Sequence, residues 1–256
     1  MRKLWWLGAV VGGIYALAQL NVAKIKRNPN RYAYARLSQD PVGQTAFIDR
    51  PDGTRIRTVV AGKGPTIVLA HGYGVSLKEW NVVSELLVGK GYRVIMFDWR
   101  GHGQSTIGRD GIEPEVVAGD YKAVLEHYDV QDGILVGHST GGYLAIATLL
   151  THPETAARLR GLVLFASLAG DAVKDAPQNK AQIPLIQAGI MTWVCTTELL
   201  GYPFGASIYG KEPSSAAIQV FLDEFQAQDH QQLLPLLRRL AETSFTAAYT
   251  KSACPP

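Results

Sequence analysis

Residues 133–144 read GILVGHSTGGYL and join a predicted buried strand directly to a predicted helix. The apolar run at 133–136 is typical of a strand inside a parallel sheet, and residues 142–152 favour a helix. Between them, the pentapeptide GHSTG turns the chain sharply, and its small residues let neighbouring backbone approach closely. Gly-x-Ser-x-Gly is a weak pattern in a chain with 26 glycines, so the interpretation depends on the flanking strand and helix.

Ser139, at the centre of this turn, is the candidate catalytic nucleophile. A strand that turns directly into a helix holds the residue at the turn in a strained backbone conformation. The turn also places Ser139 at a helix N-terminus, where free amides and the helix dipole stabilise developing negative charge. The structural alternative is a glycine-rich turn in which the serine is incidental. The strand, turn and helix together favour the catalytic interpretation.

The segment HGYG, residues 71–74, follows the continuous apolar run TIVLA. In a parallel sheet, ligands bind at the carboxyl ends of the strands, where such loops meet. The backbone N–H of Tyr73 could therefore pair with that of Thr140 in an oxyanion hole. A second loop, DWRGHGQS, contains Arg100 and His102, which could be catalysts. We favour the interpretation that they brace the loop through local hydrogen bonds.

Strands alternate with helices of 10 to 15 residues, which indicates crossover connections and a mainly parallel sheet. The turn signal PDG joins the first two strands as a hairpin. The predicted fold class is α/β: a mainly parallel sheet flanked by helices, with a helical lid after the sixth strand. Strands are predicted at 45–48, 55–60, 66–70, 92–97, 133–136 and 159–165, and helices at 79–90, 115–127, 142–152, 183–191, 214–227 and 231–242.

The composition is that of a globular protein with a hydrophobic core, with 47% apolar and 18% charged residues. The net charge of +3 is small, and much of the excess lies near the N-terminus. No basic patch interleaved with aromatic residues occurs elsewhere in the sequence, so nucleic acid is not an expected partner. Cys195 and Cys254 do not have the spacing of metal ligands, and no metal site is predicted.

Residues 4–20, LWWLGAVVGGIYALAQL, are almost wholly apolar and have basic residues on both sides. This is close to the minimum length for a membrane-spanning helix, since a span needs roughly 20 residues. A cleaved signal peptide fits the basic start and the small residues of ALA at 16–18. A retained anchor fits the paired tryptophans Trp5 and Trp6 and the basic cluster that follows. We expect a membrane-anchored chain, with secretion after cleavage as the alternative.

The strand–turn–helix around Ser139, together with the HGYG and DWRGHGQS loops, closely resembles the α/β-hydrolase fold family. Within it, the resemblance is to serine esterases, lipases and cofactor-free haloperoxidases, and it covers residues 45–170 well. It implies that Ser139 forms an acyl-enzyme, with the amides of Tyr73 and Thr140 as oxyanion donors and without a cofactor. Epoxide hydrolases and haloalkane dehalogenases of this fold carry an aspartate in the turn, so the serine favours acyl transfer.

The sequence departs from this family in the remaining catalytic residues. A serine nucleophile needs a histidine base and an acid that orients it, in the chain order Ser, acid, His. None of the six histidines fits the base by position; His230 lies at a polar boundary within the lid. Asp171 is a possible acid, but it could equally cap the next helix. Residues 246–256 lack strand character, so we expect a C-terminal truncation relative to the family, with the last strands missing.

The sequence thus favours a serine hydrolase acting on a small or lipid-like ester or related acyl compound, because apolar lid residues could line a pocket. The alternative is a catalytically inactive, hydrolase-like protein or binding remnant that lacks the triad acid and histidine. The oligomeric state is left open. The predicted organisation is an anchor or signal segment at 1–24, a linker at 25–42, an α/β core at 43–170, a helical lid at 171–245 and an atypical tail at 246–256.

Overall fold

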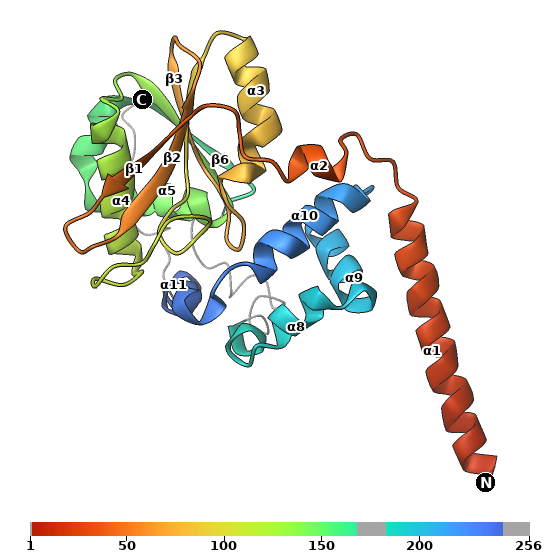
Figure 1. Cartoon of the computed structure of the whole chain (residues 1–256). Coiled ribbons are helices and arrows are strands. Elements are labelled where there is room, and N and C mark those ends of the chain that lie inside the picture. Colours follow the sequence, from red (N-terminus) through yellow and green to blue (C-terminus); the bar gives the residue numbers. More distant parts are fainter. Residues whose placement is uncertain (1, 168–182, 243–256) are drawn as a thin grey trace, which may run out of the picture.

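The computed structural model describes residues 2–167 and 183–242, and within them six strands form one sheet in the order β1-β2-β4-β3-β5-β6 (Figure 1). β2 pairs antiparallel with both β1 and β4. The pairs β3–β4, β3–β5 and β5–β6 are parallel. The mainly parallel α/β fold expected from the sequence is confirmed. The strands are β1 (Gln44–Asp49), β2 (Arg55–Ala61), β3 (Thr66–Ala70), β4 (Arg93–Phe97), β5 (Gly133–His138) and β6 (Leu159–Phe165).

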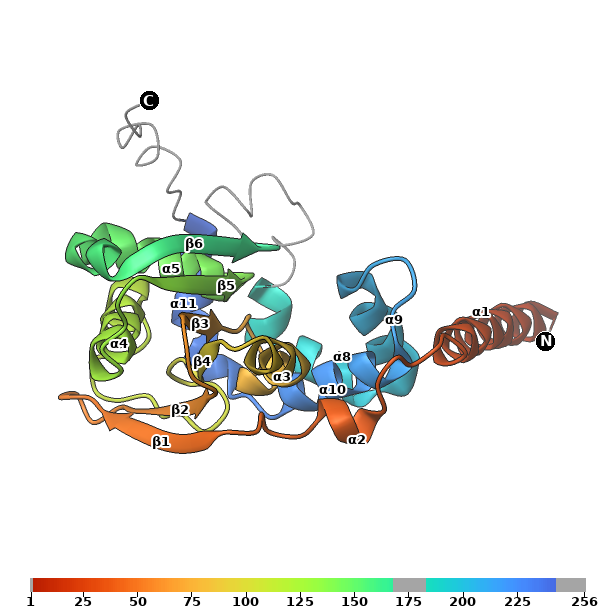
Figure 2. The same ribbon diagram turned by 90° about the horizontal axis from the view of Figure 1, so that it is seen from above.

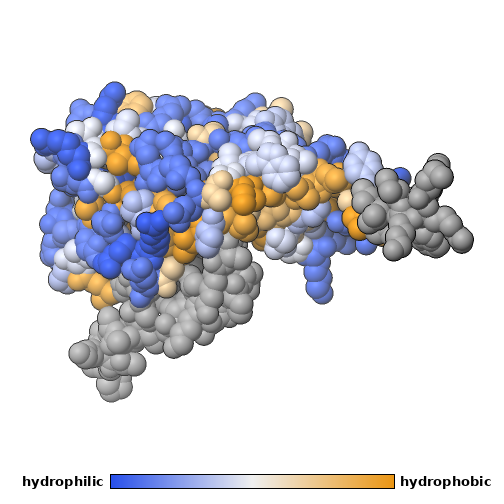
Figure 3. Space-filling model, turned by 90° about the horizontal axis from the view of Figure 1, so that it is seen from below, coloured by the Kyte–Doolittle hydropathy of each residue, from blue (hydrophilic) through white to orange (hydrophobic). Residues whose placement is uncertain are grey.

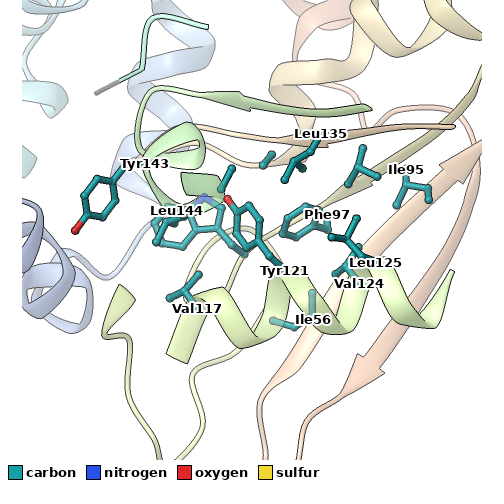
Figure 4. Packing of buried hydrophobic residues seen from close by; sticks show 14 of the residues in the cluster. Ile56, Ile95, Phe97, Val117, Tyr121, Val124, Leu125, Leu135, Tyr143 and Leu144 are labelled. Carbon is teal, nitrogen blue, oxygen red and sulfur yellow. The ribbon is translucent and has the colours of Figure 1, made fainter. Parts of the chain in front are cut away.

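Helices pack on both faces of the sheet (Figure 2). Because side chains alternate along a strand, Ile95 and Phe97 of β4 join the cluster that contains α4 and α5, while Val94 and Met96 join the cluster on the opposite face, against α3. Tyr121 of α4 meets Phe97 edge to face, with ring centroids 4.8 Å apart (Figure 4). These helices are α3 (Asn81–Gly89), α4 (Pro114–His127) and α5 (Thr140–Thr151).

A buried ion-pair network ties the β1–β2 turn to α4. The Arg100 guanidinium donates to Asp120 Oδ2 at 2.6 Å and to Asp52 Oδ2 at 2.9 Å, and all three side chains are buried. Burial alone would raise the pKa of Asp52, but hydrogen bonds from Thr54 and the charge of Arg100 lower it to about 2. Arg100 therefore has a structural role, as expected, but its side-chain bonds to Asp120 and Asp52 reach α4 and the β1–β2 turn and are not local to its own loop.

Four described helices after β6 lie beside the sheet, and we call them the cap (Figure 1). The last of them also buries Leu233 and Leu236 in the hydrophobic cluster between the sheet and α4. In Figure 2, the arrowheads of β5 and β6 point toward this side of the molecule. The cap has its own hydrophobic cluster, in which Ile218, Leu222 and Phe225 of α10 are buried. Its helices are α8 (Ile190–Thr196), α9 (Glu198–Ile208), α10 (Ser215–Gln226) and α11 (His230–Glu242).

The cap helix α9 was not predicted from the sequence. Gly201, Pro203 and Gly205 lie inside it, and these residues normally interrupt helices. The structure gives a packing reason for Gly205, where a Cβ would lie only 2.7 Å from the Ile218 side chain of α10. The glycine therefore lets the two helices approach closely, and this tertiary contact outweighs the weak local propensity.

The apolar N-terminal segment forms α1 (Arg2–Lys26), and its C-terminal end packs on the cap. Val22 and Ile25 are buried in the hydrophobic cluster of the cap, and Lys26 pairs with Glu198 of α9. Within the expected linker at 25–42, Asn30 accepts a hydrogen bond from the Ala216 amide at the start of α10. A short helix, α2 (Tyr34–Leu37), lies in the same segment. These residues therefore contact the folded body.

Among the described residues, no helix combines the length and apolarity needed to cross a membrane. The expected membrane anchor, the membrane as a partner and the membrane localisation are therefore wrong. The apolar run at 4–20 is shorter than the roughly 20 residues of a span. Beyond it, α1 continues through Asn21 and Lys24 to the side chains that contact the cap.

We expect Arg100→Met to lower the free energy of unfolding by about 3–5 kcal/mol, because removing one partner leaves buried carboxylates uncompensated. Urea unfolding followed by circular dichroism measures the change. Arg160→Met is the matched control, since the Arg160–Asp132 pair is exposed and should contribute little. Equal unfolding free energies for the two variants would contradict the structural role of the network.

Asp52 should also give the fold an acid dependence. Its folded-state pKa of about 2 lies below the ordinary 3.8, so the ionised carboxylate stabilises the fold above about pH 4. This contribution is lost as the pH falls toward 2. Between these pH values the urea midpoint should therefore fall more steeply for the wild type than for Asp52→Asn. Parallel curves for the wild type and this variant would argue against the assignment; Asp110→Asn, at an exposed site, is the control.

Candidate active site

Ser139 lies between β5 and α5 at φ 50° and ψ −120°, a conformation that non-glycine residues rarely adopt. Hydrogen bonds to the end of β6 and beyond it help to hold it there: its N–H donates to the Phe165 carbonyl at 3.0 Å, and the Ser167 hydroxyl donates to its carbonyl at 2.7 Å. Ser139 is half-buried, and its hydroxyl forms no hydrogen bond within the part of the chain that is described. The backbone strain expected from the sequence is present.

Close backbone approaches explain two of the glycines around Ser139. A Cβ at Gly141 would lie 2.4 Å from the His71 carbonyl oxygen, and one at Gly137 would lie 2.3 Å from the Gly142 Cα. Atoms do not approach so closely without displacement, so a side chain at either position would push α5 away from the sheet. The glycines therefore bring the start of α5, and Ser139 with it, against the end of β3.

The Thr140 amide is free to serve a ligand. The N–H groups of Gly142 and Tyr143 both donate to the Ser139 carbonyl, at 3.1 and 3.2 Å. The Thr140 N–H, one residue after Ser139, has no hydrogen-bond acceptor among the described residues. It lies in the first turn of a 12-residue helix, where the dipole favours negative charge. An oxyanion is the kind of group that this amide can bind.

In the HGYG loop, the two amides that flank Tyr73 are both bonded to side chains. The Gly72 N–H donates to Glu79 Oε2 at 3.1 Å, and the Gly74 N–H donates to His102 Nε2 at 3.1 Å. The Tyr73 N–H between them has no acceptor in the described ranges. A Cβ at Gly72 would lie 3.5 Å from the Ser139 Cβ, so this loop passes beside the candidate nucleophile.

None of the six histidines is hydrogen-bonded to Ser139 within the described residues. His71 and His102 are fully buried, and burial lowers the pKa of both. For His138, burial would lower the pKa, but its interaction with Glu79 raises the value above the ordinary range. His138 thus belongs to an ion pair beside the turn. The other three lie at the ends of α4 and α5 and in the cap: His127, His152 and His230.

The structure brings Ser139, Tyr73 and Thr140 together, whereas Asp171 lies outside the described residues. Sequence reasoning missed Glu79, whose carboxylate contacts both the HGYG loop and His138. The one sequence feature that could have pointed to Glu79 is its position shortly after the HGYG loop. It also missed Ser167, which follows β6. No cluster of potential metal ligands occurs among the residues described.

Part of the chain is similar in sequence to known proteins. A family model described as "alpha/beta hydrolase fold" matches residues 65–186. A non-heme haloperoxidase from Rhodococcus erythropolis is 41% identical over 96 residues, which cover 38% of this chain and 35% of the relative. A bifunctional esterase/perhydrolase from Acinetobacter calcoaceticus is 41% identical over 78 residues, or 30% of this chain and 28% of the relative. Each match thus spans about a third of the relative's length.

The fold is also similar to a solved structure. An esterase from Exiguobacterium antarcticum superposes with a TM-score of 0.71 at 22% identity, covering 82% of this chain and 77% of the esterase. At that identity the likeness concerns the fold alone. The segment that matches the family model, residues 65–186, contains both the strained turn at Ser139 and the HGYG loop beside it. The chain has the α/β-hydrolase fold, and residues 65–186 match the model of that family.

Proposed function

We propose that this protein is a serine hydrolase that cleaves an ester or related acyl substrate through an acyl-enzyme on Ser139. The observation that carries the proposal is a strained serine beside two backbone amides, those of Tyr73 and Thr140, that have no acceptor among the described residues. Preorganised N–H donors near a nucleophile stabilise the negative charge that develops on a carbonyl oxygen during acyl transfer.

In the proposed reaction, Ser139 Oγ attacks the carbonyl carbon of the substrate, and its proton passes to a base. The carbonyl oxygen becomes an oxyanion that accepts hydrogen bonds from the Tyr73 and Thr140 amides. Collapse of this intermediate breaks the bond to the leaving alcohol, which takes up a proton, and leaves an ester on Ser139. Water then attacks that ester through a second oxyanion, which releases the acid and restores the serine. The proposal assigns the nucleophile and the two oxyanion donors, and assigns no base.

The name of one relative supports acyl transfer, and the names of the others differ. The Acinetobacter relative is named an esterase/perhydrolase, and the Rhodococcus relative a haloperoxidase. A relative from Mycobacterium tuberculosis is named epoxide hydrolase B, with 34% identity over 116 residues. The serine in the turn favours acyl transfer over epoxide opening for this chain.

The cap gives little support to the expectation of a lipid-like substrate. That expectation assumed that apolar lid residues line a pocket. Met191 is instead buried in the cap's own cluster, and Trp193 and Leu200 are exposed. Figure 3 shows apolar residues gathered across the middle of the underside of the molecule. We therefore propose an ester or related acyl compound without further specification.

A fluorophosphonate probe tests the proposal, because it forms a covalent bond only with an activated serine. We expect the wild type to gain the mass of one adduct, with the label on Ser139, and Ser139→Ala to gain none. Peptide mass spectrometry locates the label. Ser207→Ala, which removes an exposed hydroxyl in α9, is the control and should label like the wild type.

The absence of labelling in wild-type protein with a cooperative unfolding transition would overturn the proposal. The chain would then be a hydrolase-like protein without this activity, which is the alternative that the sequence allows. Labelling at a serine other than Ser139 would equally count against the assignment.

A further inference from the structure

Cap helix α10 contacts the HGYG loop directly. At Gly74, where φ is +75°, an added Cβ would lie 2.6 Å from the Phe225 ring. Lys78, in the 3₁₀ helix η1 (Leu77–Trp80) that follows the loop, donates to Glu224 Oε1 at 2.9 Å. The C-terminal end of α10 is therefore fastened to the chain on one side of the candidate oxyanion hole.

Cap helix α11 reaches the same loop through its first residue, His230. The Tyr73 hydroxyl lies 2.8 Å from Nδ1 of His230, the first residue of α11. The two residues are 157 positions apart in the sequence. The tyrosine ring also meets His102 edge to face, with centroids 5.7 Å apart, and Phe225 packs on the His230 ring at 4.0 Å. Tyr73 thus has its amide at the candidate site and its side chain in the cap.

The direction of this hydrogen bond follows from the other imidazole nitrogen. His230 Nε2 lies 2.7 Å from the Phe225 carbonyl oxygen, which can only accept, so Nε2 carries the proton. In a neutral imidazole, Nδ1 is then an acceptor, and Tyr73 donates to it. Burial lowers the pKa of His230 and raises the pKa of Tyr73, which keeps both groups neutral. His230 therefore bridges the Phe225 carbonyl and the Tyr73 hydroxyl in one fixed tautomer.

We propose that His230 is a positioning residue for the oxyanion hole, because it holds the HGYG loop in place through the Tyr73 hydroxyl. This inference deepens the proposed function and rests on it. The loop backbone is fixed on either side of Tyr73 by Glu79 and His102. Among the described residues, the bond to His230 is the hydrogen bond that holds the Tyr73 side chain. By holding the side chain, it also limits the remaining rotation of the peptide that carries the Tyr73 N–H.

The Tyr73–His230 bond should matter in the transition state more than in substrate binding. An oxyanion forms only during reaction, so misplacement of its donor lowers kcat and leaves KM nearly unchanged. A catalytic group misplaced by about 1 Å can lower the rate up to about 100-fold. Because the HGYG loop would still be held at both flanks, we expect loss of the Tyr73–His230 bond to lower kcat by about tenfold.

Two substitutions of His230 separate its two hydrogen bonds. His230→Asn places an amide oxygen near the position of Nδ1 and keeps an acceptor for Tyr73. His230→Gln places an amide nitrogen near Nε2 and keeps a donor for the Phe225 carbonyl. Hydrolysis of p-nitrophenyl acetate gives kcat and KM for these variants, for Tyr73→Phe and for the Tyr73→Phe/His230→Gln double variant. Tyr202→Phe, which removes a cap hydroxyl bonded to Gln219, is the matched control.

We expect Tyr73→Phe and His230→Gln to lower kcat about tenfold with KM nearly constant, and His230→Asn to stay within about threefold of the wild type. The double variant should be no slower than either single variant, because both remove the same bond. Wild-type kcat in Tyr73→Phe would overturn the inference, and so would equal losses in His230→Asn and His230→Gln. If the wild type labels with fluorophosphonate at Ser139, such results count against His230 alone; if it does not label, both proposals fail.

Discussion

The hydrogen bond from the Ser139 N–H to the Phe165 carbonyl connects the turn after β5 to the end of β6, and the candidate site depends on it. A serine at positive φ keeps that conformation only where its surroundings hold it there. Here β6 supplies the acceptor, Ser167 donates to the Ser139 carbonyl, and Gly141 lets α5 begin against β3. The geometry of the site is therefore a property of three neighbouring strands, and the pentapeptide alone does not account for it.

The polar groups of the HGYG loop show how one donor is kept available in a buried region. Unpaired buried N–H groups are costly, and most are therefore hydrogen-bonded. The loop follows this rule on both sides of Tyr73, with acceptors from η1 and from the loop after β4. His102, at first a candidate catalyst, is one of those acceptors. The Tyr73 amide is the exception, and an exception of this kind calls for a functional explanation.

The sequence was most informative where structure is decided locally. Continuous apolar runs located β3, β4 and β6 to within a residue, because buried parallel strands differ sharply from their flanking turns. Helix α9 was missed because its glycines serve packing against α10. The anchor prediction for α1 rested on residues 4–20 and took no account of Val22 and Ile25, which are buried in the hydrophobic cluster of the cap. At the site, the strand–turn–helix pattern pointed to Ser139 as the candidate nucleophile. Glu79 and His230 make contacts between distant segments, which no local pattern encodes.

Because Val22 and Ile25 belong to the hydrophobic cluster of the cap, α1 and the cap are mechanically one body at that junction. The 25 residues of α1 form a rod about 38 Å long, attached near its end. A tilt of the cap by about 10° would carry the far end of this rod through about 7 Å, by simple leverage over that length. A tilt of the cap that moves Tyr73 only slightly would thus move the N-terminal end of α1 by several times as much. A distance measurement from a label at that end could record the tilt.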